Sequence, residues 1–355
     1  MTGNHLYQAD IDNVLSQNTV FDELQGKRIL ITGATGMIGV CLIDLLMTYS
    51  FHSGQPIFIL ALARNEEKMR HRFAEYLSED NFSYVIGDVN QGILPIAEKI
   101  DVIIHAASNS HPVAYVEDPI GTIKTNVLGL DYLLEYAAKE KIQRFVFLSS
   151  IEIYGENNTE RERFTESDCG YINCNTLRAG YPESKRVGEA LCQAYKKKYG
   201  IDIVIARLSR VYGPTMQMND SKVISQFIRR AVCKEDIILK SEGKPRYSYT
   251  YVVDAAAAIL TILVKGTSGE AYNVADSNSE TSVLELAQMI SEMAGVSIVF
   301  EIPDEVERSG YSNVQRSLMS AAKLEGLGWR AATPLESGVN RTIVCLSERD
   351  LPFGC

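Results

Sequence analysis

The sequence has few of the residues that hold metals and disulfide frameworks. It contains seven cysteines, an odd number with no CxxC pair, and only five histidines in 355 residues. These counts predict neither a disulfide framework nor a zinc site. We therefore expect no metal centre and a reducing, cytoplasmic location.

Long hydrophobic runs are also missing. The opening segment MTGNHLYQADIDNVL lacks the basic start and the apolar stretch of an export signal, and apolar segments such as IFILALA are too short to cross a bilayer. We expect neither export nor a membrane partner.

An excess of basic residues is absent as well. Lysine and arginine number 35 against 45 aspartates and glutamates, which gives a formal net charge of −10. Such a chain repels a polyphosphate backbone, so nucleic acid is not expected as a partner. Any phosphate ligand would have to be held by local donors.

The apolar residues that are present alternate with helix-like segments. The runs RILITG, IFILALA, DVIIHAA, RFVFLSS and IDIVIARL are almost unbroken by polar residues, as in strands that are buried on both faces of a parallel sheet. This pattern predicts an α/β fold with a doubly wound parallel sheet, the Rossmann architecture. We expect an N-terminal arm over 1–26, a Rossmann domain over 27–213 to which later segments return, and a smaller mixed C-terminal region over 214–355.

A glycine-rich turn follows the first predicted strand. The segment ILITGATGMIG places Gly33, Gly36 and Gly39, with Met37 and Ile38 between them, at the start of an apolar helix. Glycines there let the backbone approach a pyrophosphate, which the free N–H groups and the positive end of the helix would bind. A plain strand–helix turn is the alternative, but its position between strand and helix favours a dinucleotide cofactor site.

Two later strand ends fit the same cofactor. Asp88, followed by Val89, ends one strand and would accept a hydrogen bond from an adenine amino group, unless it is an ordinary turn residue. Ala106, Ala107 and Ser108 close another strand with small side chains, beside which a nicotinamide ribose would fit.

The second predicted strand ends without an acidic residue. NAD sites usually place a carboxylate there for the ribose hydroxyls, whereas this sequence has Ala63 and then Arg64. Arg64 suits the 2′-phosphate of NADP. Alternatively, Arg64 is solvated and Glu66 or Glu67 reaches the ribose, so the sequence leaves NAD and NADP both open.

A tyrosine and a lysine stand on one face of a predicted helix. Tyr181 and Lys185 are four positions apart in GYPESKR. A nearby ammonium group would lower the tyrosine pKa from about 10 toward neutrality and make the phenol a base for a hydroxyl proton. We predict that both residues are catalytic and also touch the cofactor, although such a pair also arises by chance.

The strand RFVFLSS ends in a serine at the sheet edge where ligands bind. Ser150 would hydrogen-bond the hydroxyl that Tyr181 deprotonates. Glu152, two residues later, would point to the same side of an extended strand and act as a second acid or base. The alternative is an exposed strand-end glutamate.

These features together resemble the extended short-chain dehydrogenase/reductases, the NAD(P)-dependent epimerase/dehydratase family that acts on nucleotide sugars. The segments SSIEIYG, GYINCNTLRAGYPESKR and ARLSRVYGPTMQMND are most similar to those of UDP-glucuronate decarboxylases. The resemblance implies a nucleoside diphosphate sugar as substrate, oxidation of the sugar at C4, and then decarboxylation or 4,6-dehydration. The alternatives are a 4-epimerase, an NADPH-dependent reductase and a non-enzymatic NAD(P)-binding regulator.

The resemblance also implies a homodimer, formed through helices around 120–138 and 183–199, and a set of substrate-binding residues. The sequence departs from the family pattern at Ile151, which replaces a polar residue, at Arg210, which replaces an asparagine, and at Arg246, which lies one position before the family's arginine. The implied substrate-binding residues are Asn109, Asn126, Arg178, Arg210, Asn219 and Arg246.

Overall fold

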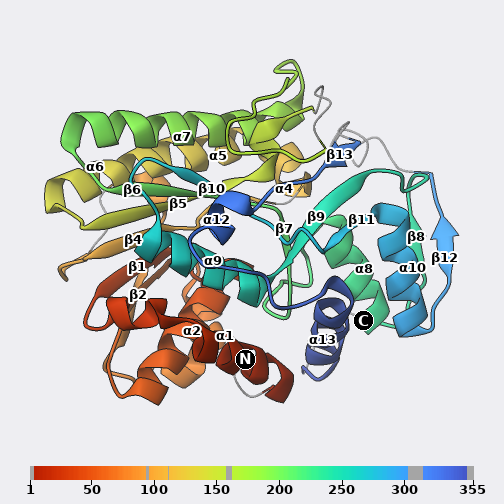
Figure 1. Ribbon diagram of the computed structural model, residues 1–355, viewed down its shortest axis with the longest axis horizontal. Coiled ribbons are helices and arrows are strands. Elements are labelled where there is room, and N and C mark those ends of the chain that lie inside the picture. Colours follow the sequence, from red (N-terminus) through yellow and green to blue (C-terminus); the bar gives the residue numbers. More distant parts are fainter. Residues whose placement is uncertain (1–3, 93–95, 111, 157–161, 303–314, 350–355) are drawn as a thin grey trace.

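The main layer of the protein is a parallel β-sheet (Figure 1). The computed structural model describes all residues except 1–3, 93–95, 111, 157–161, 303–314 and 350–355. Seven strands, all parallel to their neighbours, follow the order β10-β6-β5-β4-β1-β2-β3, which confirms the predicted doubly wound sheet. They are β1 (Arg28–Thr32), β2 (Phe58–Ala63), β3 (Phe82–Ile86), β4 (Val102–His105), β5 (Arg144–Ser150), β6 (Ile203–Leu208) and β10 (Ala271–Val274).

The central strands are apolar along their whole length because both of their faces are covered. Leu30 of β1 pairs in register with Leu60 of β2 and Ile103 of β4, and each of these side chains is at most 1% exposed. This burial on both sides explains why these strands read as continuous apolar runs rather than as an alternation.

Helices lie on both faces of the sheet (Figure 1). One face carries α2 (Met37–Ser53) and α9 (Val252–Lys265), and the other carries α5 (Pro119–Lys124), α6 (Leu130–Glu140) and α7 (Gly180–Tyr199). The short helices α3 (Glu66–Arg72) and α4 (Pro112–Glu117) lie in the connections that follow β2 and β4.

The predicted N-terminal arm is mostly helical and packs on the sheet domain. Helix α1 (His5–Gln17) contacts α2 and α9, and a 3₁₀ helix, η1 (Thr19–Leu24), leads into β1. The Tyr7 hydroxyl donates to Asp44 at 2.9 Å, and the Tyr251 hydroxyl donates to Asp10 at 2.7 Å. Burial raises the pKa of Asp44 to about 6. Buried polar contacts therefore tie the arm to the body.

The smaller C-terminal region is mixed, and α9 and β10 return from it to the main layer. Its strand β9 pairs with β7, β11 and β13, and β8 pairs with β12 in a separate parallel pair. Its elements are β7 (Arg210–Tyr212), α8 (Val223–Val232), β8 (Ile237–Leu239), β9 (Arg246–Tyr251), β11 (Glu280–Ser282), α10 (Val283–Ala294), β12 (Ile298–Phe300), β13 (Arg316–Ser317), α12 (Ala322–Glu325) and α13 (Leu335–Ser347).

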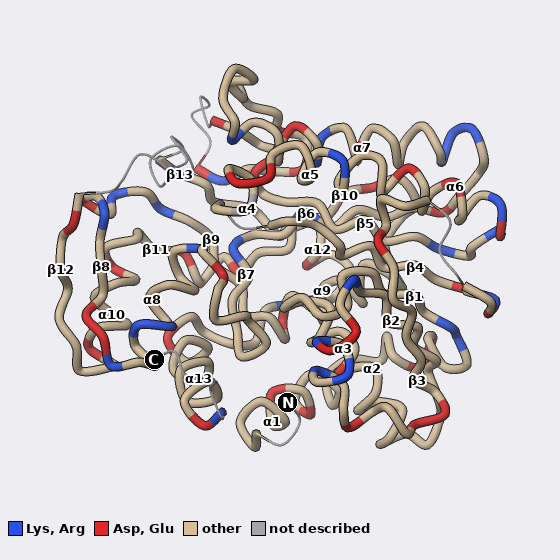
Figure 2. Tube along the Cα trace, turned by 180° about the vertical axis from the view of Figure 1, so that it is seen from behind, with Lys and Arg blue, Asp and Glu red and all other residues tan. Residues whose placement is uncertain are grey.

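Three further features of the fold concern the charged residues, the hydropathy of the helices and the cysteines. Basic and acidic residues are interspersed along the described chain (Figure 2). None of the described helices combines the length and the hydropathy that a membrane span needs. Cys233 is disulfide-bonded, a pairing that the sequence did not predict. The free thiols are Cys41, Cys169, Cys174, Cys192 and Cys345.

Candidate active site

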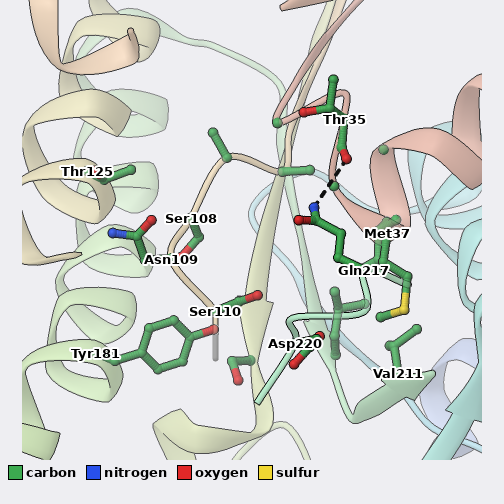
Figure 3. A pocket seen from close by; sticks show the side chains of 18 of the residues that line it. Thr35, Met37, Ser108, Asn109, Ser110, Thr125, Tyr181, Val211, Gln217 and Asp220 are labelled. Carbon is green, nitrogen blue, oxygen red and sulfur yellow. Dashed lines mark hydrogen bonds between the residues drawn. The ribbon is translucent and has the colours of Figure 1, made fainter. Parts of the chain in front are cut away.

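A cavity of about 380 Å³ lies at the carboxyl ends of the parallel strands (Figure 3). The strand order reverses direction at β1, because β2 and β3 follow on one side while β4, β5 and β6 follow on the other. Connections leave the two central strands in opposite directions there, which opens a crevice for ligands. The cavity extends from the glycine turn after β1 to Tyr181 on α7.

Two of the three turn glycines are required by the backbone itself. Gly33 has a left-handed conformation with φ of 65°, and a Cβ at this residue would lie 2.7 Å from the carbonyl oxygen of Ala106. A Cβ on Gly39 would lie 2.6 Å from the carbonyl oxygen of Gly33. Neither position can hold a larger residue without a shift of the main chain.

Gly36 has a different environment. It is the N-cap of the 17-residue helix α2, and a Cβ there would meet only the carbonyl oxygen of Gly33, at 3.1 Å. Its open side lines the cavity. The free N–H groups of a helix start, beside a residue without a side chain, fit a pyrophosphate group. The residues present therefore fit a dinucleotide cofactor.

Almost all of the predicted cofactor residues line this cavity; the exception is Lys185, which is 3% exposed and lies behind the wall. Residues that the sequence analysis did not single out also line it, among them Thr35, Lys68, Tyr115 and Gln217. The predicted residues that do line it are Gly33, Gly36, Met37, Ile38, Gly39, Arg64, Asp88, Val89, Ala106, Ala107, Ser108 and Tyr181.

Tyr181 points from α7 into the cavity (Figure 3). Burial raises the pKa of its phenol to about 12, and the hydroxyls of Ser150 and Ser108 act in the opposite direction. The Lys185 ammonium lies 6.0 Å from the Tyr181 ring centroid and donates to the carbonyl of Leu148 at 2.8 Å. The lowering of the Tyr181 pKa predicted from the Tyr–Lys spacing is therefore wrong for this structure, in which burial raises the pKa.

Tyr115 holds the ring of Tyr181 in place. It is 5% exposed, and its ring stacks on that of Tyr181 with 4.7 Å between centroids and 20° between planes. Such a stacked pair restricts the orientation of both rings. Nothing in the sequence indicated this contact, since it joins α4 to α7 across the fold.

Glu152 lines the cavity, but from a 3₁₀ helix rather than from the extended strand that was predicted. Strand β5 ends at Ser150, and Ile151–Tyr154 form a 3₁₀ helix, η5, so the strand alternation assumed for Glu152 is wrong. The Glu152 carboxylate lies 2.7 Å from Nη2 of Arg178 and 3.6 Å from Nη2 of Arg210. Burial alone would raise its pKa, but the two guanidinium groups lower it further than burial raises it. Glu152 is therefore an ionised carboxylate at neutral pH.

The two arginines stand where the first cavity meets a second one of about 610 Å³. The Arg210 guanidinium lies 3.7 Å from the ring centroid of Tyr247. Its buried Nε and the buried hydroxyl of Tyr249 have no hydrogen-bond partner among the described residues. Unpaired buried donors beside a cavity indicate a place for an anionic ligand.

The other predicted substrate residues are divided between the cavity and the interior. Asn109 and Asn219 line the first cavity. Asn126 does not line it: it is buried behind Ser108, whose hydroxyl donates to it at 2.8 Å. Arg246 also lies outside both cavities and forms an ion pair with Glu285 at 3.0 Å. It precedes Tyr247 by one residue on β9, and neighbouring residues of a strand point to opposite faces.

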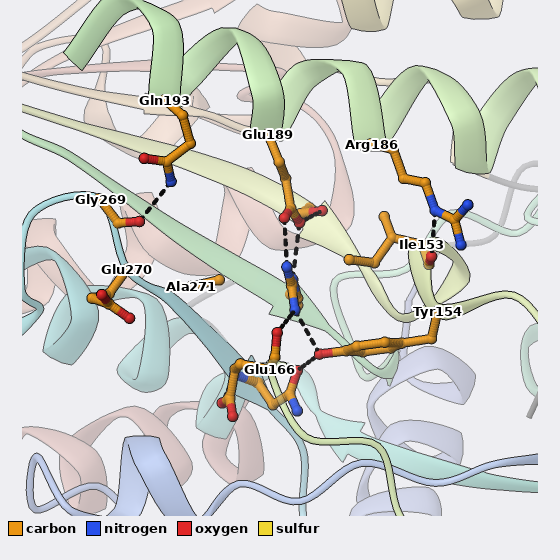
Figure 4. A network of polar contacts seen from close by, with 12 residues as sticks. Ile153, Tyr154, Glu166, Arg186, Glu189, Gln193, Gly269, Glu270 and Ala271 are labelled. Atoms are coloured by element: carbon orange, nitrogen blue, oxygen red, sulfur yellow. Dashed lines mark hydrogen bonds and ion pairs between the residues drawn. The ribbon is translucent and has the colours of Figure 1, made fainter. Parts of the chain in front are cut away.

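A buried ion pair joins the ends of neighbouring strands to helix α7 (Figure 4). Arg207 of β6 donates to both carboxylate oxygens of Glu189 on α7, at 3.0 and 2.7 Å, and to the Tyr154 hydroxyl at 3.0 Å. Ser149 donates to the same carboxylate at 2.6 Å. The side chains of Arg207 and Glu189 are only 12% and 13% exposed. The sequence analysis missed this network, which joins β5, β6, η5 and α7.

Substitution Arg207→Met should lower the free energy of unfolding by about 3–5 kcal/mol, because it leaves the Glu189 carboxylate buried without its partner. Urea unfolding measures the loss. The double variant Arg207→Met/Glu189→Leu should recover much of the lost stability, since no unpaired charge remains. A loss below about 1 kcal/mol in the single variant would show that water replaces the guanidinium.

Several known protein sequences are similar to this chain over most of its length. A sequence model of the NAD dependent epimerase/dehydratase family matches residues 29–275. UDP-glucuronic acid decarboxylase 1 of Xenopus tropicalis is 32% identical over 327 residues, which cover 90% of this chain and 72% of that protein. UDP-glucuronic acid decarboxylase 2 of Arabidopsis thaliana is 30% identical and covers 89% of this chain and 67% of its own length.

Solved structures show the same fold. The dTDP-glucose 4,6-dehydratase DesIV of Streptomyces venezuelae, solved with NAD bound, has a TM-score of 0.79 at 24% identity, covering 90% of this chain and 97% of its own. The UDP-glucuronic acid 4-epimerase of Bacillus cereus has a TM-score of 0.76 at 20% identity, covering 90% and 99%. With the family match over most of its length, and with the glycine turn and Tyr181 in one cavity, the chain belongs to the NAD dependent epimerase/dehydratase family.

Proposed function

We propose that this enzyme oxidises the sugar of a nucleoside diphosphate sugar at C4. It would then either decarboxylate the sugar at C5 or carry out a 4,6-dehydration. One observation carries the proposal: the Tyr181 phenol, the Ser150 hydroxyl and an arginine-bound Glu152 carboxylate line a single cavity. The names of the relatives, UDP-glucuronic acid decarboxylases, support decarboxylation.

The first cavity would hold the cofactor and the sugar. The glycine turn would bind the pyrophosphate, and Ala106, Ala107 and Ser108 would lie beside the nicotinamide ribose. A bound oxidised nicotinamide would supply the hydride acceptor and a positive charge near the reacting sugar.

Tyr181 would accept the proton of the C4 hydroxyl while Ser150 holds that hydroxyl in place. Because burial keeps the phenol protonated, its action as a base requires positive charge nearby. Lys185 supplies part of it: burial lowers the pKa of this ammonium to about 8, which leaves it charged at neutral pH.

The second step depends on residues other than Tyr181, Ser150 and Lys185. A ketone at C4 turns a C5 carboxylate into a β-keto acid, which loses carbon dioxide readily. Glu152, ionised at neutral pH, would orient the substrate for decarboxylation, which needs no base, or would remove the C5 proton in a 4,6-dehydration. Arg178 and Arg210 would bind the sugar carboxylate or the diphosphate. The second cavity, lined by Phe227 and Tyr249, would take the nucleoside.

An NADPH-dependent nucleotide-sugar reductase is the second candidate, because Arg64 lines the cofactor cavity. Enzymes that return the hydride to the same sugar keep their cofactor through each cycle, whereas a reductase exchanges it at every turnover. Cofactor that stays bound through purification would favour the first proposal, and exchange would favour the reductase.

Substitution Glu152→Gln tests the proposed reaction. Reduction of the cofactor by UDP-glucuronate should still be observable in a single turnover, while the next step slows by about 10²–10⁴-fold, so that a 4-keto sugar and reduced cofactor accumulate. Absorbance at the reduced nicotinamide band and mass spectrometry of the sugar measure this. Glu140→Gln, on the exposed side of α6, is the matched control. Full turnover at the wild-type rate in Glu152→Gln would make 4-epimerisation the leading function.

We also propose a homodimer formed through the face of α5, α6 and α7. Apolar side chains are exposed there: Ile120 of α5 by 67%, Val187 of α7 by 44%, and Leu128, in the π-helical segment η4 (Thr125–Gly129) between α5 and α6, by 43%. Leu128→Glu/Val187→Glu should convert the protein to a monomer in light-scattering chromatography, because a second copy would bury these charges. Phe51→Glu, 85% exposed on the opposite face of the sheet, should leave the mass unchanged. An unchanged mass in the double variant would contradict this interface.

A further inference from the structure

The end of β2 and the start of α3 form one end of the first cavity. Leu62, Ala63, Arg64 and Lys68 line it there. Asn65 caps α3, and its side chain accepts from the backbone N–H of Lys68 at 2.7 Å. This cap fixes the first turn of the helix, with Arg64 just before it and Lys68 within it.

Both cations at this end lack an anionic partner. The exposed Arg64 and the half-buried Lys68 form no side-chain ion pair or hydrogen bond with other residues that the structure describes. Burial lowers the pKa of Lys68, and the positive charges of Arg72 and Arg64 lower it further. Arg64 and Lys68 therefore place two positive charges at the wall of the cavity in a protein of net charge −10. Such convergence is unfavourable unless a ligand brings negative charge.

The carboxylates that would bind a free ribose are engaged elsewhere. Glu66 lies 2.9 Å from Nε of Arg70 and accepts from the Tyr84 hydroxyl at 3.2 Å. Glu67 is exposed and does not line the cavity. Asp88 lines the cavity at the end of β3 rather than β2, and its Oδ1 accepts from the backbone N–H of Asn90 at 2.9 Å. The β2 end therefore offers cations, rather than a carboxylate, to the ribose of an adenosine group.

We infer that Arg64 and Lys68 bind the 2′-phosphate of NADP and make it the preferred cofactor. A phosphate monoester has oxygens for the planar fork of an arginine and for the point charge of a lysine. The inference rests on the proposed function only in that it requires a nicotinamide dinucleotide in the first cavity.

Binding measurements test the inference without an activity assay. Any dinucleotide that co-purifies is released and identified by mass spectrometry, and NADP or NADPH is expected. The stripped protein is then titrated in a calorimeter with NADP, NAD, 2′,5′-ADP and 5′-AMP. NADP should bind at least about tenfold more tightly than NAD, and 2′,5′-ADP more tightly than 5′-AMP, because only the 2′-phosphate differs.

Variants assign this preference to the two residues. Arg64→Ala and Lys68→Ala should each weaken NADP binding about ten- to a hundredfold and change NAD binding less than about threefold. Lys139→Ala, which removes a side chain that is 83% exposed on α6 and lies outside both cavities, is the matched control and should leave both affinities unchanged.

Three results would overturn the inference in different ways. NAD binding as tightly as NADP in the wild type would overturn it and leave the proposed function standing. An equal loss of NAD and NADP binding in Arg64→Ala and Lys68→Ala would show that the two residues support the fold of the turn. Binding of neither dinucleotide would overturn the proposed function as well.

Discussion

Replacing Tyr181 with phenylalanine should lower kcat by about 10²–10⁴-fold, because the variant lacks the group that we propose as the acceptor of the C4 hydroxyl proton. The ring remains, so the stacking on Tyr115 at 4.7 Å and the shape of the cavity are kept. Steady-state turnover of UDP-glucuronate measures the loss, and thermal unfolding and cofactor titration should match the wild type.

The neighbouring tyrosine provides the matched control. Tyr115→Phe removes a buried hydroxyl that donates to the carbonyl of Ser110 at 3.4 Å but keeps the stacked ring. Its kcat should stay within about tenfold of the wild type, since no proton of the substrate is transferred to it. Equal losses in the two variants, or near-wild-type turnover in Tyr181→Phe, would contradict the role of Tyr181 as the base.

Replacing Gly36 with valine should abolish dinucleotide binding while the protein still folds. The backbone of Gly36 is extended, with φ of −77° and ψ of 168°, which valine adopts readily. The new side chain would stand in the open space where the pyrophosphate must approach the start of α2. Calorimetric titration with NAD and NADP measures binding, and circular dichroism with thermal unfolding measures the fold.

Gly39→Val separates binding from folding in the same turn. A Cβ at Gly39 would press on backbone atoms of Gly33 and Ala34 at 2.6–2.8 Å, so this variant should lose stability itself. If Gly36→Val bound NAD and NADP as tightly as the wild type, the turn would have only a structural role and the cofactor would bind elsewhere.

Local patterns were enough to predict much of the fold. Unbroken apolar runs depend on burial of both strand faces, and the position of Gly36 before α2 depends on residues within one turn. The spacing of Tyr181 and Lys185 was sufficient for their common helix. What these residues do chemically was not predictable in the same way: Lys185 turns to the Leu148 carbonyl, and the phenol is controlled by its burial.

The sequence by itself determined the parallel sheet, the glycine turn and the helix of Tyr181, because each follows from periodicity or spacing over a few residues. Only the tertiary structure decided that Glu152 is held between Arg178 and Arg210, and that Arg246 faces Glu285 instead of the cavity. The physical reason is that burial, charge pairing and the face of a strand end depend on neighbours that lie far away in the chain and meet only when the fold is complete.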